Sequence, residues 1–361
     1  MSAPLYVTTE SGLLVAIDTE NSRLRVLYED PLREVLFGIA CHEDRMFLSG
    51  ATGLTTGRLT TRGFERLSTH VPFTPPVRGE GRRLMRWFWS RIGAYSRVIS
   101  YDKPGLHQMN LYHDRLYVAA TVWNEIWIVD FGLHVLKRIA LEPHMRDFYH
   151  LNNVFCDGTA FYVCLNRYDG RPGIGGYIKF DLAWNEIERR AIGWQSHALS
   201  VINGQVIQLC CLSPETGIPT RHPAQAGLMV GQNLAFEYDA RQFFLKDFSM
   251  TDDRIYLVGG TTTERANRTT SAGVVMTLTR SFTFIKMEVF PGLGGFNGCR
   301  LMGLDYSKGV APTSRGIAET VRVIDHAEPT PKTLPLHRKS TPRWSAAKHG
   351  THDGEPTKPV A

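Results

Sequence analysis

Short stretches in which apolar and polar residues alternate, separated by turn sequences, cover most of residues 4–304. Alternation with a period of two is typical of β-strands that bury one face. Residues 106–118 show the basic unit, in which an apolar run, a turn at His113 and Asp114, and a second apolar run follow one another. This pattern predicts an inner strand, a tight turn and a second strand.

The same unit recurs along the chain, starting at Phe37, His107, His150, His197 and Lys246. In four copies the unit starts eight residues before the residue that opens its second strand. In the copy at His150 this distance is ten residues. The last four starts are 43, 47 and 49 residues apart. Four-stranded propeller blades need about 40 to 50 residues, so each unit predicts one blade.

The two ends of this region complete each other. Three strand-like runs at residues 5–7, 13–17 and 24–27 lack an inner strand before them, and residues 296–304 look like an inner strand without partners. Pairing the N-terminal strands with this last strand would make a sixth blade and remove open sheet edges. We therefore expect an all-β fold, a six-bladed β-propeller closed by its N-terminal strands.

In this layout the chain resembles six-bladed β-propellers in general, a class that includes calcium-dependent lactonases, lyases and strictosidine-synthase-like enzymes. The resemblance covers about residues 4–304 and rests on the repeat pattern. Blades that open with His-x-x-Asn, as at His107 and His150, are also similar to those of arylsulfotransferase-type propellers. The resemblance implies the architecture and carries no catalytic residue across.

Two segments lie outside the repeats and set the predicted domain boundaries, a propeller over residues 1–306 and a tail over 307–361. Residues 79–101 form an insertion on the rim, and a helix over 83–92 would have a basic face and a Trp/Phe-rich face. Such a segment suits contact with an anionic membrane or a partner protein, or simple packing across the rim. The tail is basic, rich in Pro, Thr and His, and predicted to be disordered.

Composition narrows the choice of function. The 43% hydrophobic and 21% charged content is typical of a soluble globular protein. No apolar run reaches about 18 residues and the N-terminus lacks a signal-peptide pattern, which favours a cytoplasmic protein. The net charge is +6, but residues 331–361 carry six Lys or Arg against two Asp or Glu. A near-neutral body gives little support to nucleic-acid binding. Six cysteines without a C-x-x-C pair predict buried free thiols.

Three histidines are the main candidates for chemistry. His107, His150 and His197 start three consecutive units, so propeller symmetry should bring them to one mouth of the central channel, with Lys246 next and Asn297 a sixth member. Three imidazoles match a catalytic zinc site, or part of the four-histidine iron site of carotenoid oxygenases. The predicted metal ligands are thus His107, His150 and His197, with zinc, iron or manganese as the divalent metal.

Two alternatives to a metal site remain open at this stage. The histidines and Lys246 could perform acid–base or anion-binding chemistry without a metal. Each histidine could instead only hydrogen-bond a neighbouring blade. Around them, Asn152 lies on the same side of its strand as His150, and Arg167 ends the second strand of that blade. The candidate catalytic residues are therefore His150, His197, Lys246, Asn152 and Arg167.

The leading hypothesis is a soluble enzyme that acts on a small polar or anionic substrate by hydrolysis or elimination. The alternative is a non-catalytic scaffold that docks a partner or membrane surface through residues 83–92.

Overall fold

The computed structural model describes residues 4–70, 104–171, 173–202, 204–211, 226–263 and 265–301. The predicted rim insertion at 79–101, with its segment 83–92, and the predicted tail at 307–361 lie outside these residues.

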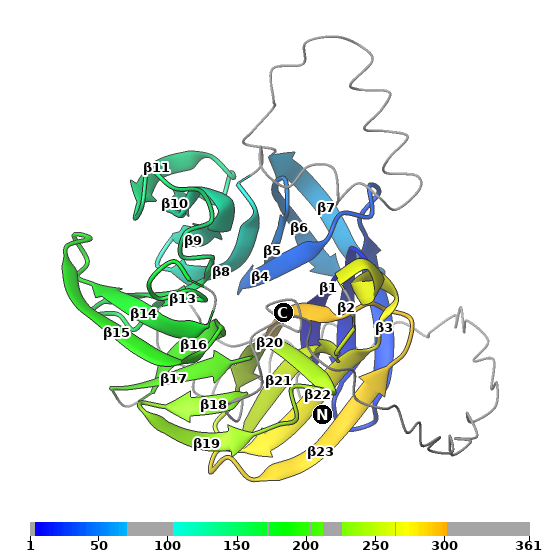
Figure 1. Ribbon diagram of the computed structural model, residues 1–361. Coiled ribbons are helices and arrows are strands. Elements are labelled where there is room, and N and C mark those ends of the chain that lie inside the picture. Colours follow the sequence, from blue (N-terminus) through cyan, green and yellow to red (C-terminus); the bar gives the residue numbers. More distant parts are fainter. Residues whose placement is uncertain are drawn as a thin grey trace, which may run out of the picture. The chain divides into compact units, whose positions relative to one another are not determined.

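Six four-stranded antiparallel sheets make up the described chain and form a ring of blades (Figure 1). The first three blades are β4 (Leu36–His42), β5 (Arg45–Gly50), β6 (Leu54–Thr60) and β7 (Gly63–His70); β8 (Leu106–Tyr112), β9 (Arg115–Ala120), β10 (Glu125–Val129) and β11 (Val135–Ala140); and β12 (Leu151–Cys156), β13 (Phe161–Leu165), β14 (Ile174–Phe180) and β15 (Glu186–Trp194).

The other three blades are β16 (Ser196–Ile202), β17 (Gln205–Cys210), β18 (Gly227–Val230) and β19 (Asn233–Glu237); β20 (Phe243–Met250), β21 (Arg254–Thr261), β22 (Gly273–Thr279) and β23 (Phe284–Phe290); and β24 (Phe296–Leu301) with β1 (Leu5–Thr9), β2 (Leu13–Asp18) and β3 (Arg23–Glu29). Within the described residues, two 3-10 segments lie in loops, η1 (Thr121–Trp123) and η3 (Arg265–Thr270). The predicted six-bladed β-propeller is confirmed.

The ring closes as the sequence predicted. Strand β1 pairs on one side with β2 and on the other with β24, where Val7 faces Cys299. The last blade therefore combines strands from both ends of the described chain. Within it, the side chains of Val7 and Cys299 are both buried in the same apolar cluster.

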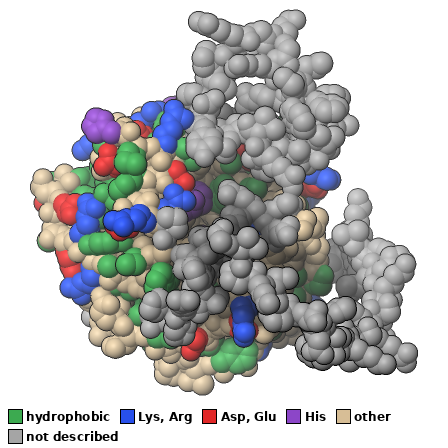
Figure 2. Space-filling model, in the orientation of Figure 1, with side chains coloured by type: hydrophobic (Ala, Val, Ile, Leu, Met, Phe, Trp, Pro, Cys, Tyr) green, Lys and Arg blue, Asp and Glu red, His purple; other side chains and the backbone are tan. Residues whose placement is uncertain are grey.

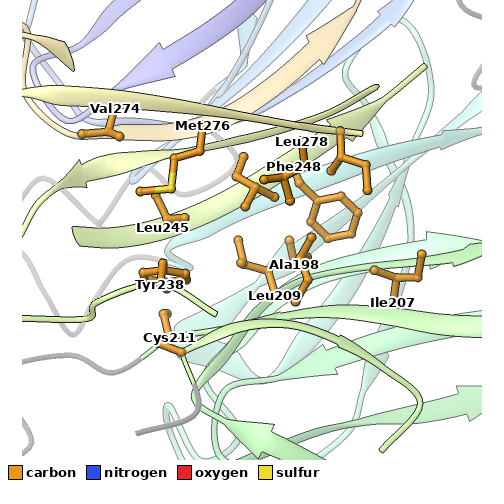
Figure 3. Close-up of a cluster of buried hydrophobic side chains, with 14 of the residues drawn as sticks. Ala198, Ile207, Leu209, Cys211, Tyr238, Leu245, Phe248, Val274, Met276 and Leu278 are labelled. Carbon is orange, nitrogen blue, oxygen red and sulfur yellow. The ribbon is translucent and has the colours of Figure 1, made fainter. Parts of the chain in front are cut away.

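Apolar side chains fill the spaces between neighbouring blades. Figure 3 shows one such cluster, in which Leu209 and Ala198 of the fourth blade face Leu245, Phe248 and Met276 of the fifth. Every blade is covered on both faces by its neighbours, so its inner strands are mostly buried. The outer strands lie at the rim, and most of their residues are exposed or half-buried. All six cysteines are free and buried, as predicted.

Asp side chains fold several of the tight turns that join the strands. The Oδ1 atom of Asp157 accepts hydrogen bonds from the backbone N–H groups of Thr159 and Ala160, each at 2.8 Å. Asp181 does the same for Ala183 and Asn185. These local bonds satisfy turn donors that no sheet partner reaches, which explains why Asp marks the turns in the sequence.

The described surface carries no obvious single-sign patch on the face shown in Figure 2, where acidic and basic side chains are interspersed. Among the described residues there is no helix of the length and apolar character needed to cross a membrane.

Candidate functional site

Every inner strand carries a β-bulge near its start. The pairing register with the second strand slips between Leu36 and Gly38, and at the equivalent place in each of the other five blades. The residues in the bulges are Phe37, His107 with Gln108, Asn152, His197, Lys246 and Asn297. A bulge turns its residue out of the regular ladder and is frequent beside functional sites. These positions form one layer around the central channel.

This register corrects one sequence prediction. In the third blade the bulge position belongs to Asn152, so His150 is not at the strand position of His107 and His197. His150 precedes β12 and has a φ of 48°, in the left-handed region. In this blade the eight-residue spacing runs from Asn152 to Ala160. Ala160 is the counterpart of the residue that opens the second strand in other blades, because its carbonyl accepts a hydrogen bond from the N–H of Asp157 across the turn. The histidine two residues earlier suggested the wrong alignment.

Two of the predicted histidines are nevertheless in ring contact. The His107 and His150 ring centroids are 5.5 Å apart and nearly perpendicular. His107 also stacks on Phe37 at 4.4 Å, and His197 packs edge-on against Phe244 at 5.2 Å. His107 and His197 thus present much of their ring surface to aromatic neighbours rather than to solvent.

Burial and neighbouring positive charge keep two of these histidines neutral. Desolvation lowers the pKa of His107 well below its usual value, and the charges of His150 and Lys246 lower it further. For His197 the main cause is again burial, followed by the charges of Lys246 and His150. Lys246 and His150 therefore act on both His107 and His197, and protonation of either of these two rings is disfavoured.

The predicted metal site has no support in the structure. Within the described ranges, no three His, Cys, Asp or Glu side chains are grouped so that they could hold a metal ion. The contacts of the three histidines explain this, because His107 and His197 pack against Phe rings and His150 uses Nδ1 to contact Asp147.

His150 belongs to a chain of three polar side chains. Its Nδ1 lies 2.8 Å from Oδ1 of Asp147. The Nη1 group of Arg167 donates to Oδ2 of Asp147 at 3.2 Å and to the Asp147 backbone carbonyl at 2.8 Å. Their side chains are all roughly 27–29% exposed, so the group is half-buried but open to solvent. Arg167, a sequence candidate, contacts Asp147 rather than His150.

The carboxylate of Asp147 is held ionised by this arrangement. Burial alone would raise its pKa, but the hydrogen bond with His150 and the positive charges of His150 and Arg167 bring the pKa below its usual value. Asp147 was missed by sequence reasoning. Its position three residues before His150 was the available signal, but nothing in the sequence showed that both would adopt left-handed backbone conformations, with φ of 52° and 48°.

Asn152, another candidate, has a structural contact. Its Nδ2 donates to the carbonyl of Ser196 in the next blade at 2.9 Å, and the side chain is fully buried. Gln108 makes a similar link to the carbonyl of Asn297 at 3.0 Å. The amide oxygens of Asn152 and Gln108 are buried without a hydrogen-bond partner among the described residues. Side-chain amides in the bulge layer thus link inner strands of different blades.

Lys246 is the bulge residue of β20 in the fifth blade and is 8% exposed. Its Nζ donates to a carboxylate oxygen of Glu10 and, at 2.7 Å, to Oδ1 of Asn297. The Asn297 amide in turn donates to the carbonyl of Leu36 at 2.8 Å. Glu10 comes from the turn after β1 and was not recognised in the sequence. It is 236 residues away from Lys246 along the chain, and only the closure of the ring brings the two side chains together.

A small half-open pocket of about 280 Å³, counting its space open to solvent, lies against Lys246. Its lining combines charged, hydroxyl and aromatic side chains with two glycines: Glu10, Phe244, Lys246, Gly260, Thr261, Thr262, Thr263, Arg268, Ser271 and Gly295. The guanidinium of Arg268 lies 4.9 Å from the centre of the Phe244 ring, and Nζ of Lys246 lies 5.5 Å from it. Phe244 also contacts His197, so it separates the pocket from the histidines.

Comparison with known proteins identifies the architecture only. No family model and no curated protein matches this chain. Similar solved structures include a chain in the crystal structure of a nidogen/laminin complex, with a TM-score of 0.50 and 11% identity over 82% of this chain and 97% of that one. Another is a protein of unknown function from Bacteroides caccae, with a TM-score of 0.50 and 10% identity over 83% of this chain and 98% of that one. At such identities the similarity shows the fold alone.

Proposed function

We propose that the channel mouth beside His150 binds a small polar or anionic substrate and that His150 transfers a proton during its hydrolysis or elimination. The observation that supports this most strongly is the 2.8 Å contact between Nδ1 of His150 and Asp147. A carboxylate at Nδ1 favours the tautomer with its proton on that nitrogen, which leaves Nε2 with a lone pair. Nε2 is then suited to act as a general base.

The three polar side chains would divide the work of proton transfer. His150 removes a proton from a water molecule in hydrolysis, or from a carbon beside an electron-withdrawing group in elimination. Asp147 stabilises the imidazolium that forms, and Arg167 holds the carboxylate in position through its two contacts with Asp147. His150 then returns the proton to the leaving group.

The surrounding charges favour a substrate with negative charge. Lys246 and Arg268 both lower the pKa of His197, so their positive charges act on a histidine of the same bulge layer. His107 and His197 stay neutral, as their lowered pKa values require, and do not compete with His150 for protons. An anion would therefore gain electrostatic attraction on entering this site.

The test is hydrolysis of p-nitrophenyl acetate and p-nitrophenyl phosphate, with elimination from a β-substituted carboxylic acid measured in parallel. We expect His150→Ala to lower kcat/KM by about 10²- to 10⁴-fold, the usual contribution of a general base. Asp147→Asn should lower kcat more than it changes KM. Another His–Asp contact provides the control, because His134 Nδ1 lies 3.1 Å from Asp130 in an exposed turn. His134→Ala should leave the rate unchanged.

Equal rates for wild type and His150→Ala would contradict the proposal. Absence of turnover on every probe would favour the alternative of a non-catalytic scaffold. That alternative is tested by deleting residues 79–101 and measuring co-sedimentation with anionic vesicles, since the predicted docking segment 83–92 lies outside the described residues.

A further inference from the structure

Lys246 is a buried amine that faces a pocket, and the proton transfer assigned to His150 makes no use of it. It sits in the bulge of β20, and its ammonium donates to Glu10 and Asn297. An ammonium has three N–H donors, and the two hydrogen bonds account for two of them among the described residues. Although Lys246 is only 8% exposed, its side chain also lines the pocket.

Lys246 and Glu10 together make a pair suited to covalent chemistry. A lysine amine becomes nucleophilic when it loses its proton, and desolvation or a neighbouring cation favours that loss. Burial lowers the pKa of Lys246; Glu10 opposes this effect, and the charge of Arg268 reinforces it. Glu10 accepts a hydrogen bond from Nζ, so a proton acceptor is already in place.

We propose that Lys246 forms an imine with a small 2-oxo acid bound in this pocket. The carbonyl carbon would lie against Nζ at the floor of the pocket. Arg268, which lines the same pocket, supplies the positive charge that a carboxylate group prefers. Phe244 offers an apolar wall for the rest of the molecule. This activity is independent of proton transfer by His150.

The reaction balances with groups present in the pocket. Glu10 takes one proton from the Lys246 ammonium, and the free amine attacks the carbonyl carbon while the C=O electron pair moves to oxygen. A proton shift from nitrogen to that oxygen gives a neutral carbinolamine. Glu10 returns its proton to the hydroxyl group, which leaves as water as the C=N bond forms. One amine and one 2-oxo acid thus give one imine and one water, without an oxidant or reductant.

Gly295 lines the same pocket and offers a position at which a side chain can be introduced. A Cβ atom placed on Gly295 would lie 3.6 Å from Cγ of Glu10 and 3.7 Å from Oγ of Ser271, which are ordinary contacts. The backbone of Gly295 has no positive φ. A side chain at this position would therefore occupy pocket space without backbone strain, which provides a variant that blocks the pocket and keeps Lys246.

The experiment is reductive trapping of the full-length protein with pyruvate and sodium borohydride, which converts an imine into a stable secondary amine. Peptide mass spectrometry then locates the adduct. We expect labelling at Lys246 and none at Lys137, an exposed lysine on β11. Lys246→Arg, which keeps the charge and the donors but cannot form an imine, should abolish the adduct. Absence of an adduct at Lys246, or equal labelling of Lys137, would overturn the proposal.

Three further variants separate chemistry from folding, and each is first checked for a native thermal transition. Gly295→Val should lower labelling of Lys246 by blocking the pocket, and Glu10→Gln should slow it by about a hundredfold through loss of the proton carrier. His150→Ala should label at the wild-type rate, so failure of the imine proposal and failure of proton transfer by His150 give different results. If Lys246→Arg fails to fold, unchanged labelling of Gly295→Val would still contradict the pocket assignment.

Discussion

His197 is a buried histidine among positive charges, and this has a consequence for stability. Lys246, His150, His107 and Arg268 all disfavour its protonation, and its exposed fraction is 7%. In the unfolded chain a histidine protonates near pH 6.5. Below that pH the unfolded state binds a proton that the folded state rejects, so the stability falls as the pH falls.

We therefore predict that His197→Gln flattens the acid side of the stability profile. Between about pH 6 and 5 the free energy of unfolding of the wild type should fall by up to about 1.4 kcal/mol per pH unit more steeply than that of the variant. Urea unfolding at several pH values measures this. The exposed His134 provides the control, and a wild-type slope retained by His197→Gln would show that His197 is protonated in the folded state.

Gly38 follows the bulge at Phe37 and lies where two blades approach each other closely. A Cβ at this position would be 2.7 Å from the carbonyl oxygen of His107 and 2.7 Å from Oγ of Ser49. Backbone atoms cannot move away easily, so Gly38→Ala should destabilise the protein by about 1–3 kcal/mol. Gly295→Ala, where the nearest contact is 3.6 Å, is the matched control. Equal urea midpoints for the two variants would contradict the close packing of these blades.

Individual residues were the hardest level to predict from the sequence. The repeat spacing aligned His107, His197 and Lys246 with one another, and in the structure all three lie in bulges. It failed at His150, because a left-handed residue before the strand cannot be distinguished by alternation from a residue within it. Glu10 could not be found either, since its contact with Lys246 exists only after the ring has closed.

A buried ion pair ties together the inner strands of two neighbouring blades. Asp247 of β20 contacts Arg300 of β24 at 3.1 Å, and both side chains are almost fully buried. Arg300 also donates to the carbonyl of Met109 in β8 at 3.2 Å, so one guanidinium connects three blades. Burial raises the pKa of Asp247, although Arg300 opposes this.

Replacing one partner of this ion pair should therefore lower the stability of the protein more than replacing both partners. We predict that Asp247→Leu destabilises the protein by about 3–5 kcal/mol, because it leaves the Arg300 charge buried without its carboxylate. The double variant Asp247→Leu/Arg300→Met should recover part of that loss. Asp253→Ala, at an exposed pair with Arg254, should have little effect. Additive losses in a double-mutant cycle measured by urea unfolding would exclude this coupling.

Strands were predicted well because each one is a short apolar or alternating run that turn residues separate from the next run. The first strands of the last blade, expected at residues 5–7 and 13–17, appear as Leu5–Thr9 and Leu13–Asp18. Bulges were not predicted, since a bulge adds a residue without changing the apolar or polar character of its neighbours. Only the pairing register reveals that all six inner strands share this feature.

At the scale of the whole molecule, closure was predictable because it follows from what each end lacks. The N-terminal strands had no inner strand and the last strand had no partners, so one composite blade resolved both. No comparable pattern along the chain constrains the chemistry inside the ring. Which polar side chains meet there depends on the angle between blades, and this is set by packing of clusters such as that in Figure 3.

The closure also leads to a direct test of register. Val7 of β1 faces Cys299 of β24, and both side chains are fully buried in one cluster. Antiparallel partners have Cα atoms about 4.5–5.5 Å apart, within the range of a disulfide. Val7→Cys should therefore form a disulfide with Cys299 under oxidising conditions. The new bond would close a loop of almost the entire propeller.

The oxidised variant should gain about 2–4 kcal/mol over its reduced form, because the cross-link restricts the unfolded chain. Thermal unfolding with and without dithiothreitol measures the gain, and peptide mapping identifies the bond. Val7→Cys/Cys299→Ser should show no such difference, since the remaining native cysteines are buried and free. If Val7→Cys kept all its thiols free after oxidation, β1 would have to pair with β24 in another register. Glu10, three residues further on, would then not reach Lys246, and the pocket proposed for imine formation would lose its proton carrier.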